Sequence, residues 1–393
     1  MGEISVKTGN NARNGGKNSL NRLIRCVCGK KIGPDPRNFN QRVSLGRNDL
    51  LIRTFLIQGA IFDTKKQKVD AQFIEYLEKV ISIFIGCEFI VSTWEFPREI
   101  YFGLCEKYPQ VNFVLNADVG PIIKIVDDVP IVTNVNRMIF STISGLREVN
   151  RKYAIKLRTD SFLYNDSILQ SLYYVMNKRE FFGLDLEKRN ERYRIFDHHV
   201  INCNLFARNP RSHLPFLYHP GDIFLAGLTK DLIKLFNIPL ATEDLIKKCN
   251  SVRNTCFMKL VPEQYIWVQC IKMSRSTDTF DYSNFTYDEK EIEKSEQYYL
   301  NNFVPYTAEE LGFCWPKHRE VYFNKGSSSI YDHEDWHHLY HKYIDGFEQP
   351  TSYAHKKRSV VIFFMKMYFF IRSSLLKIKF IRKFAYKVFV KRG

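Results

Sequence analysis

Residues 349–393 contain no acidic side chain, although they carry twelve Lys or Arg residues. Residues 1–48 are similarly one-sided, with ten Lys or Arg residues against Glu3 and Asp35. These two ends contribute +12 and +8 to a formal net charge of +16, which leaves −4 for residues 49–348. The part of the chain that can fold around a large core is therefore mildly acidic, and it has no RNA- or DNA-module motif. This distribution argues against a nucleic-acid partner.

The cysteines show no pattern of pairing. They are nine, an odd number, they are scattered through apolar contexts, and no signal peptide precedes them. We therefore expect reduced, intracellular thiols. Cys26 and Cys28 lack a second ligand pair, which argues against a zinc site there.

A dinucleotide fingerprint is also missing. The turn after the first predicted strand contains Gln58-Gly59 and not Gly-x-Gly-x-x-Gly. We therefore do not expect a nicotinamide or flavin site.

The tail lacks an uninterrupted apolar run of membrane-spanning length. Residues 360–371 are almost all apolar, but this run of about twelve residues is shorter than the roughly 20 that a bilayer requires. Apolar and basic residues then alternate over residues 375–391, which predicts a basic amphipathic helix with Phe on its apolar side. We favour a helix lying on an anionic membrane surface. The alternative is a C-terminal helix packed on the core.

The composition is that of a folded protein. Of the 393 residues, 45% are hydrophobic and 15% are aromatic. Residues 1–48 are rich in Asn, Gly, Arg and Lys, which is typical of a mobile leader. We predict three parts: this basic leader, an α/β domain over residues 49–350, and the basic tail over residues 351–393.

The domain begins with alternating strands and helices. Buried strands are predicted at residues 50–57, 87–92 and 111–115, and helical periodicity at residues 68–84 and 98–107. This alternation predicts parallel strands joined by helical crossovers, and hence an open, Rossmann-like α/β sheet.

Residues 134–165 stand at the centre of the functional argument. A long amphipathic helix is followed by an apolar strand over residues 153–157, and Arg158, Thr159 and Asp160 come directly after it. Because ligands of open α/β sheets bind beyond the carboxyl ends of strands, we expect a binding site there.

Later elements are less distinct. We predict strands at 180–186 and 198–206, a tight turn at 218–228 that presents Asp222, and helices at 229–236 and from 261, the last with Glu263 in its first turn. Residues 275–350 show no clear periodicity. They include His333 and His337 at helical spacing, but a zinc site needs three or four converging ligands and the stretch is not His-Glu-x-x-His, so we favour a solvated helix start.

Three carboxylates and three cations are candidates for chemistry. Asp160, Asp222 and Glu263 can hold a hard divalent cation or accept a proton from a hydroxyl. The cations of Arg137, Lys156 and Arg158 suit a diphosphate leaving group. Each carboxylate also has an ordinary structural explanation as a cap, a turn residue or a first-turn charge.

Several short sequence blocks, in their order along the chain, resemble the WavE family of lipopolysaccharide-synthesis proteins. They are LIQG at 56–59, VSTWE at 91–95, NVNR at 134–137, YAIKLRTD at 153–160, GDIF at 221–224 and PEQYIW at 262–267. The resemblance covers roughly residues 50–340. It implies a glycosyltransferase with a GT-A type, nucleotide-sugar-binding fold.

The resemblance also implies positions for the donor. Gln58 and Gly59 would lie under the nucleotide, and Asn136-Arg137 would belong to the helix bordering the sugar nucleotide. Lys156, Arg158 and Asp160 match a segment that is Asp-x-Asp in many such enzymes. Asp160 would then hold a divalent cation, Mn²⁺ or Mg²⁺, but Arg158 stands at the first Asp position and leaves metal dependence open.

The sequence hypothesis is transfer of a sugar from a nucleotide sugar to a lipopolysaccharide or other lipid-linked acceptor. The enzyme would be cytoplasmic and peripheral on the inner membrane. Asp222, slightly preferred, or Glu263 would act as base if configuration inverts, and no base is needed if it is retained. The alternative is a glycan- or membrane-binding protein without turnover.

Overall fold

The structure is a computed structural model that describes residues 53–126, 129–250, 255–276, 288–318, 327–378 and 380–381. It also describes the backbone of three short strands nearer the N-terminus, β1 (Ser5–Thr8), β2 (Arg22–Arg25) and β3 (Lys31–Gly33). The rest of the predicted mobile leader lies outside the described residues, as does most of the alternating pattern over residues 375–391. The division of the chain into three parts stays a prediction.

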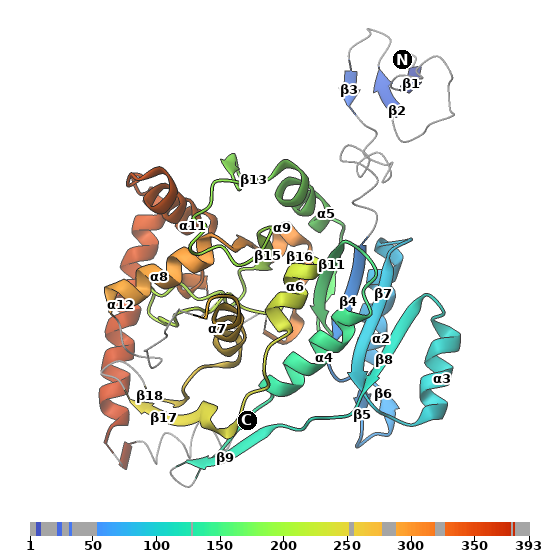
Figure 1. The fold of residues 1–393 in the computed structure, drawn as a ribbon, viewed down its shortest axis with the longest axis horizontal. Coiled ribbons are helices and arrows are strands. Elements are labelled where there is room, and N and C mark those ends of the chain that lie inside the picture. The colour runs from blue at the N-terminus through green and yellow to red at the C-terminus, as the bar shows by residue number, and fades with distance from the viewer. Residues whose placement is uncertain are drawn as a thin grey trace.

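A seven-stranded mixed sheet organises the molecule (Figure 1). Its strands lie in the order β19 (Phe303–Tyr306), β15 (Val200–Cys203), β16 (Leu225–Leu228), β11 (Tyr153–Arg158), β4 (Arg53–Gln58), β7 (Glu88–Trp94) and β8 (Val111–Asn116). The four strands from β11 to β8 are parallel to one another, and β16 pairs antiparallel with both β11 and β15. The predicted open α/β sheet is confirmed.

The first half of the domain follows the expected strand–helix alternation. Helix α2 (Ala71–Ile83) joins β4 to β7, and α3 (Arg98–Lys107) joins β7 to β8. Between β4 and β7 a small hairpin, β5 (Phe62–Asp63) and β6 (Lys68–Val69), precedes α2. A second hairpin, β9 (Ile122–Val126) and β10 (Val129–Thr133), leads from β8 towards the central helix.

Helix α4 (Val135–Arg147) is the amphipathic helix predicted before β11. It packs on β4, β7 and β8, and its buried face includes Val135, Ile139, Ile143 and Leu146. Because β11 pairs in parallel with β4, with Arg158 opposite Gln58, the two strands end at the same edge of the sheet. This pairing places the two candidate ligand segments side by side.

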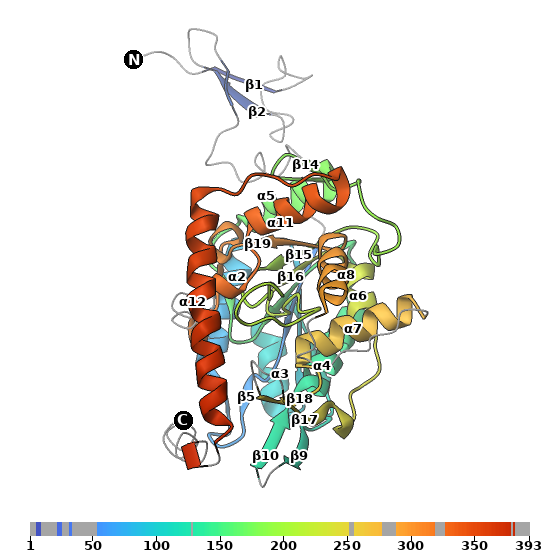
Figure 2. The same ribbon diagram turned by 90° about the vertical axis from the view of Figure 1, so that its left-hand side faces the viewer.

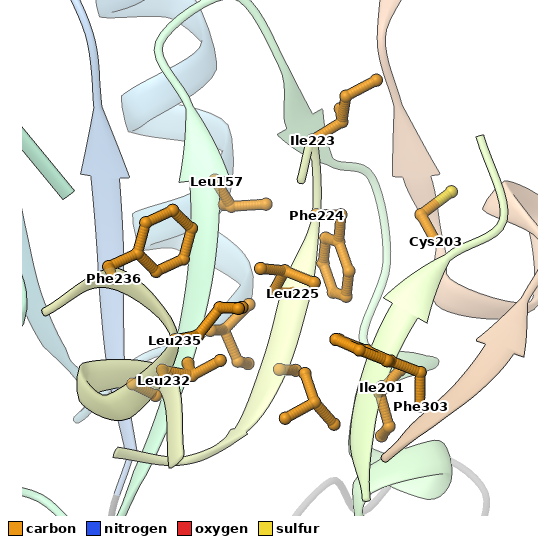
Figure 3. Close-up of a cluster of buried hydrophobic side chains, with 14 of the residues drawn as sticks. Leu157, Ile201, Cys203, Ile223, Phe224, Leu225, Leu232, Leu235, Phe236 and Phe303 are labelled. Atoms are coloured by element: carbon orange, nitrogen blue, oxygen red, sulfur yellow. The ribbon is translucent and has the colours of Figure 1, made fainter. Parts of the chain in front are cut away.

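The core continues from the sheet into α6 (Thr229–Phe236) (Figure 3). Leu232, Leu235 and Phe236 of α6 pack towards the side chains of the central strands. The same cluster includes Leu157, Leu225 and Ile201 of strands β11, β16 and β15, and Phe303 of the edge strand β19. All of them are buried, because helices cover the strands of a mostly parallel sheet and exclude water from its faces.

The second half of the domain differs from the sequence prediction. Residues 218–228 were predicted as a turn, but this segment ends in strand β16. Residues 180–186, predicted as one strand, form a small hairpin of two strands with two residues each, β13 (Glu180–Phe181) and β14 (Leu184–Asp185). Residues 275–350, where no periodicity was evident, contain α8 (Glu289–Leu300), β19, α9 (Ala308–Leu311) and α11 (His333–Tyr340). The buried faces of α8 and α11 are largely aromatic and polar, so a count of aliphatic residues does not detect these two helices.

Six further elements complete the second half of the domain. The short strands β12 (Phe162–Leu163) and β20 (Phe313–Cys314) pair with each other, and β17 (Ile246–Asn250) pairs with β18 (Thr255–Met258). Helices α5 (Ile168–Leu172) and α7 (Pro262–Ser274) follow β12 and β18. The predicted helix with Pro262 and Glu263 in its first turn is therefore present as α7.

The C-terminal helix is longer than the sequence suggested. Helix α12 spans Tyr353–Leu376, 24 residues, with mean hydropathy 1.5 over its most apolar window, and only 6% of that window is buried. The prediction that this segment is too short to cross a bilayer was wrong, because the helix extends beyond the apolar run at both ends. By length and composition it is one candidate span among the described residues. Figures 1 and 2 both show it running along one side of the domain.

Candidate functional site

A cavity of about 520 Å³ opens at the carboxyl ends of β4 and β11. The segment that follows each of these strands, the first turn of α4 and the start of α7 all contribute to its wall. The lining residues that matter for the chemistry are Gln58, Gly59, Asn134, Arg137, Arg158, Thr159, Asp160, Phe206, Asp222, Glu263 and Trp315. Residues from seven separate segments therefore converge at the edge where the sequence predicted a ligand.

Gly59 forms the floor between the two strand ends. Its φ of +133° is rarely adopted by residues with a side chain, and a Cβ atom there would lie 2.7 Å from Thr159 Oγ1. The backbone NH of Thr159 donates to the carbonyl of Gln58, and that of Gly59 donates to the carbonyl of Ser92, both over 3.1 Å. Glycine at this position allows the backbone after β4 to approach the backbone after β11.

Arg158 and Asp160 form a bidentate pair at the cavity wall. Arg158 Nε donates to Asp160 Oδ1 over 2.8 Å, and Nη2 donates to Oδ2 over 3.0 Å. Burial acts to raise the pKa of Asp160, but the hydrogen bonds and charge of Arg158 hold it below its ordinary value. The guanidinium also lies over the Trp315 ring, 5.3 Å from its centroid. Both carboxylate oxygens of Asp160 are therefore engaged by a cation of the chain.

Asp222 is held from behind by a fully buried lysine. Lys156 Nζ lies 3.2 Å from Asp222 Oδ2 and also donates to the backbone carbonyl of Asp222. Burial lowers the pKa of Lys156, and the Asp222 carboxylate acts in the opposite direction. Gly221, with φ of +76°, makes the turn that sets Asp222 between Lys156 and the cavity. A Cβ atom on Gly221 would lie 3.2 Å from the carbonyl oxygen of Leu205.

Glu263 lies in the first turn of α7 and lines the cavity. Burial raises the pKa of its carboxyl to about 7, with a further increase from the negative charge of Asp222. The Nε2 atom of His219 is 3.6 Å from Glu263 Oε2. Burial lowers the pKa of His219 to about 3, so this imidazole is neutral and does not compensate the glutamate. A carboxyl with a pKa near neutrality is suited to taking and giving a proton.

Seven of the nine predicted site residues line this cavity: Gln58, Gly59, Arg137, Arg158, Asp160, Asp222 and Glu263. Lys156 lies beneath Asp222 and is fully buried, and the Asn136 side chain turns away and exchanges hydrogen bonds with the backbone of Ala241. Arg137 is at the rim, where Asp118 and Asn134 accept hydrogen bonds from its guanidinium. The functional roles of the nine residues stay predictions. Lys156 and Asn136 are placed to orient other groups and not to touch a ligand.

Several lining residues had no signal in the sequence. Trp315 comes from the region without periodicity, and Phe206 follows β15 with a φ of +61° that is uncommon for a residue with a side chain. Asn134, which precedes α4, also lines the cavity; it begins the NVNR block but was not among the predicted site residues. Aromatic faces beside charged groups are a common arrangement for binding flat or ring-shaped ligands. These residues are recognised only once distant segments are folded together.

The three predicted carboxylates of the cavity do not fit a divalent cation site. A fourth carboxylate of the wall, Asp70, caps α2 by accepting a hydrogen bond from the backbone NH of Gln72. Asp160 is occupied by Arg158, Asp222 is paired with Lys156, and Glu263 has its pKa raised towards the neutral form. A hard cation requires several free oxygen ligands. Within the described ranges, the three-ligand group close enough to hold an ion is elsewhere, at Glu334, His338 and His355.

Comparison with known proteins gives one extended match. A family model described as WavE lipopolysaccharide synthesis matches residues 53–369. A comparison with curated proteins finds no match.

Several solved structures are similar at low identity. The glycosyltransferase GlyE of Streptococcus pneumoniae TIGR4 is 13% identical to this chain, with a TM-score of 0.26. The similar region covers 47% of this chain and only 38% of GlyE. The mannosyltransferase PcManGT of Pyrobaculum calidifontis, solved with GDP-Man and Mn²⁺, is 8% identical over 83% of this chain and 87% of its own, with a TM-score of 0.32. An active-site mutant of LgtC is 8% identical over 78% of this chain and 94% of its own, with a TM-score of 0.34. These scores are too low to transfer a ligand or a residue role.

Proposed function

Because the chain belongs to the WavE lipopolysaccharide synthesis family, we propose that it is a GT-A type glycosyltransferase acting on a nucleotide sugar. The acceptor in this proposal is a lipopolysaccharide core or another bacterial surface glycan. The observation that carries the proposal is the cavity at the ends of β4 and β11, which combines a guanidinium with a carboxyl whose pKa is about 7. The guanidinium can neutralise the leaving diphosphate, and the carboxyl can take the proton of the acceptor hydroxyl in an inverting transfer.

In this proposal the donor diphosphate lies against Arg158 above Gly59. The guanidinium presents several N–H donors in a planar arrangement, and a phosphate can share them with Asp160 or displace that carboxylate. The backbone at Gly59 has no side chain to separate it from the ligand. Asp160 positions Arg158 and is not assigned a metal ion.

The acceptor is activated by Glu263 in the proposed reaction. Its carboxylate takes the proton of an acceptor hydroxyl as the hydroxyl oxygen forms a bond to the anomeric carbon. The bond from that carbon to the diphosphate oxygen breaks, and the nucleoside diphosphate leaves with the electron pair. We prefer Glu263 over Asp222, the choice from sequence, because Asp222 is already paired with buried Lys156. Retention of configuration would require no base.

Calorimetry with a panel of nucleotide sugars, followed by transfer assays on lipopolysaccharide acceptors, tests the activity. We expect one donor class to bind and to be turned over. A protein that binds glycan or membrane without nucleotide-dependent turnover would contradict the proposal and favour the non-catalytic alternative.

Neutralisation of the diphosphate by Arg158 predicts little dependence on divalent cations. EDTA is expected to leave the initial rate within about threefold, whereas Arg158→Ala should lower kcat/KM by about 100-fold, the usual loss for one electrostatic group. Arg147→Ala is the matched control, because Arg147 is exposed at the far end of α4 and bonds only to Asn237 Oδ1 in the described part of the chain. A 100-fold stimulation by Mn²⁺ over the EDTA-treated enzyme would contradict this assignment.

The proposal places the enzyme on the inner face of the cytoplasmic membrane through α12. Eleven large apolar side chains after residue 359 are exposed, among them Phe363, Phe364 and Ile371. Basic residues accompany them, as expected for a helix facing anionic lipid. The helix also contacts the domain, since Phe369 stacks on His213 at 5.4 Å and Ser373 is buried. This lateral packing supports a helix lying in the interface and not crossing it.

Replacing Phe363, Phe364 and Ile371 together by Ser is expected to reduce binding to anionic vesicles by at least about 100-fold. Each large apolar side chain contributes roughly 1.5–3 kcal/mol when it is fully buried in an apolar medium. Sedimentation with vesicles measures the change, and circular dichroism checks that the helix remains. Unchanged sedimentation of the triple variant would rule out α12 as the attachment surface.

A further inference from the structure

Three potential metal ligands meet where α11 lies beside the start of α12. Glu334 and His338 are one turn apart on α11, and His355 is in the first turn of α12. One ligand atom from each lies within 4.8 Å of the other two, and the two imidazole rings are 4.9 Å apart between centroids. Small side-chain rotations bring such atoms to the spacing of a tetrahedral site.

The imidazole nitrogens at this place lack hydrogen-bond partners. Both ring nitrogens of His338 and Nδ1 of His355 are shielded from solvent and have no partner among the described atoms. The nearest carboxylate oxygen to His355 Nδ1 is Asp335 Oδ1, at 3.9 Å, which is beyond hydrogen-bond distance. Buried polar atoms are normally paired. One nitrogen of each imidazole lies within 4.8 Å of the Glu334 carboxylate, so a cation held between these three groups would satisfy one nitrogen of each ring.

The local charge also suits a cation. Arg358 Nη1 is 2.5 Å from Asp332 Oδ2 and 2.7 Å from Asp335 Oδ2, so two carboxylates compensate this single guanidinium. Glu334 adds a third negative charge, and its oxygens accept hydrogen bonds from the backbone NH and hydroxyl of Ser352. Unlike the guanidinium that engages Asp160, these donors are neutral, so the Glu334 charge is not compensated by them and each oxygen retains a second lone pair for a metal ion.

We propose that Glu334, His338 and His355 form a site for Zn²⁺ or a similar divalent transition metal, with water as a fourth ligand. Two imidazoles and a carboxylate are typical zinc ligands, and they disfavour Mg²⁺ and Ca²⁺, which prefer oxygen. His333 and His337, the pair noted in the sequence, are not part of this group. His333 Nε2 faces Glu310 Oε2 at 3.0 Å, and the ring of His337 lies against Phe181.

The consequence is a link between the domain and its apolar helix. Two ligands belong to α11, which packs on α8 and β19, and the third belongs to α12. A bound ion would therefore fix the N-terminal turn of α12 to the domain beside the Arg358 ion pairs. Metal binding stabilises whichever state has the site assembled.

Titration of the full-length, metal-free protein with Zn²⁺ tests the site. We expect one ion per chain bound by these residues, a higher Tm with zinc, and at least about 100-fold weaker binding in His338→Ala and in His355→Ala. His337→Ala is the matched control, since it removes a neighbouring imidazole of the same helix and should bind zinc like the wild type.

Cobalt spectroscopy separates this site from cysteine ligation elsewhere in the chain. The Co²⁺ complex should show tetrahedral d–d bands without thiolate charge transfer, and His355→Ala should abolish them. The proposal is overturned if no zinc binds, if the cobalt spectrum shows thiolate ligands only, or if His338→Ala and His355→Ala bind zinc as tightly as His337→Ala does.

Discussion

Glu263→Gln is expected to lower the rate of sugar transfer by about 10²–10⁴-fold, the usual contribution of a general base. Glutamine has nearly the same shape and can still contact the acceptor, but its amide cannot take the hydroxyl proton. KM for the donor should change little, because the proposed donor contacts come from Arg158 and the backbone at Gly59. Steady-state kinetics with saturating acceptor measure the loss in kcat.

The pH dependence gives a second test of the same residue. Since burial raises the pKa of Glu263 to about 7 in the free enzyme, its carboxylate forms only near neutrality, and kcat/KM should rise with pH through about 7 and level off at higher pH. The free energy of unfolding should fall over the same rise in pH. The folded state binds this proton more tightly than the unfolded state does, so the associated stabilisation is present below the ordinary pKa of 4.5 and is lost as pH rises to about 7.

Glu99→Gln provides the control, because Glu99 is also a first-turn glutamate but lies exposed on α3. It should retain wild-type activity and both pH profiles. Glu263→Gln should lose both the catalytic rise and the decline in stability over the same pH range. Transfer by Glu263→Gln within threefold of the wild type would exclude the glutamate as base and favour a retaining reaction or Asp222.

The sequence was sufficient to predict the edge of the sheet at which the cavity lies. Strands β4, β7 and β11 are buried on both faces, and the edge strand β8 is buried on one, so they appear as short, mostly apolar runs separated by helical periodicity. The polar residues at the ends of β4 and β11 then share one edge because parallel strands in register end together. The parallel pairing of β4 with β11, which places Arg158 opposite Gln58, confirms the predicted shared edge.

The partners of the charged residues could not be predicted in the same way. Lys156 meets Asp222 because β16 pairs antiparallel with β11, with Lys156 opposite Leu225, and that pairing is not encoded in either segment alone. The raised pKa of Glu263 likewise depends on burial beside Asp222 after folding. Helix α8 was missed because its buried positions include Ser295 and Glu296, the latter paired with Arg211.

The buried Lys156–Asp222 pair predicts the largest effect on stability. Lys156→Met keeps most of the side-chain volume but leaves the Asp222 carboxylate buried without its cation. Breaking a buried pair in this way costs about 3–5 kcal/mol. Denaturant unfolding should show the loss, and activity should fall as well, because Asp222 borders both Glu263 and the cavity.

A double-mutant cycle distinguishes loss of the pair from loss of packing. Asn at position 222 removes the uncompensated charge, so Lys156→Met combined with Asp222→Asn should recover most of the stability lost in Lys156→Met alone. Lys230→Met is the control, because Lys230 pairs with Asp197 at the exposed surface and its loss should change the free energy of unfolding little. If the double variant is as unstable as Lys156→Met, the lysine stabilises the sheet by packing against Phe236 and not by neutralising Asp222. Recovery of stability without recovery of activity would show that the pair sets the charge of the cavity and that folding tolerates its neutral replacement.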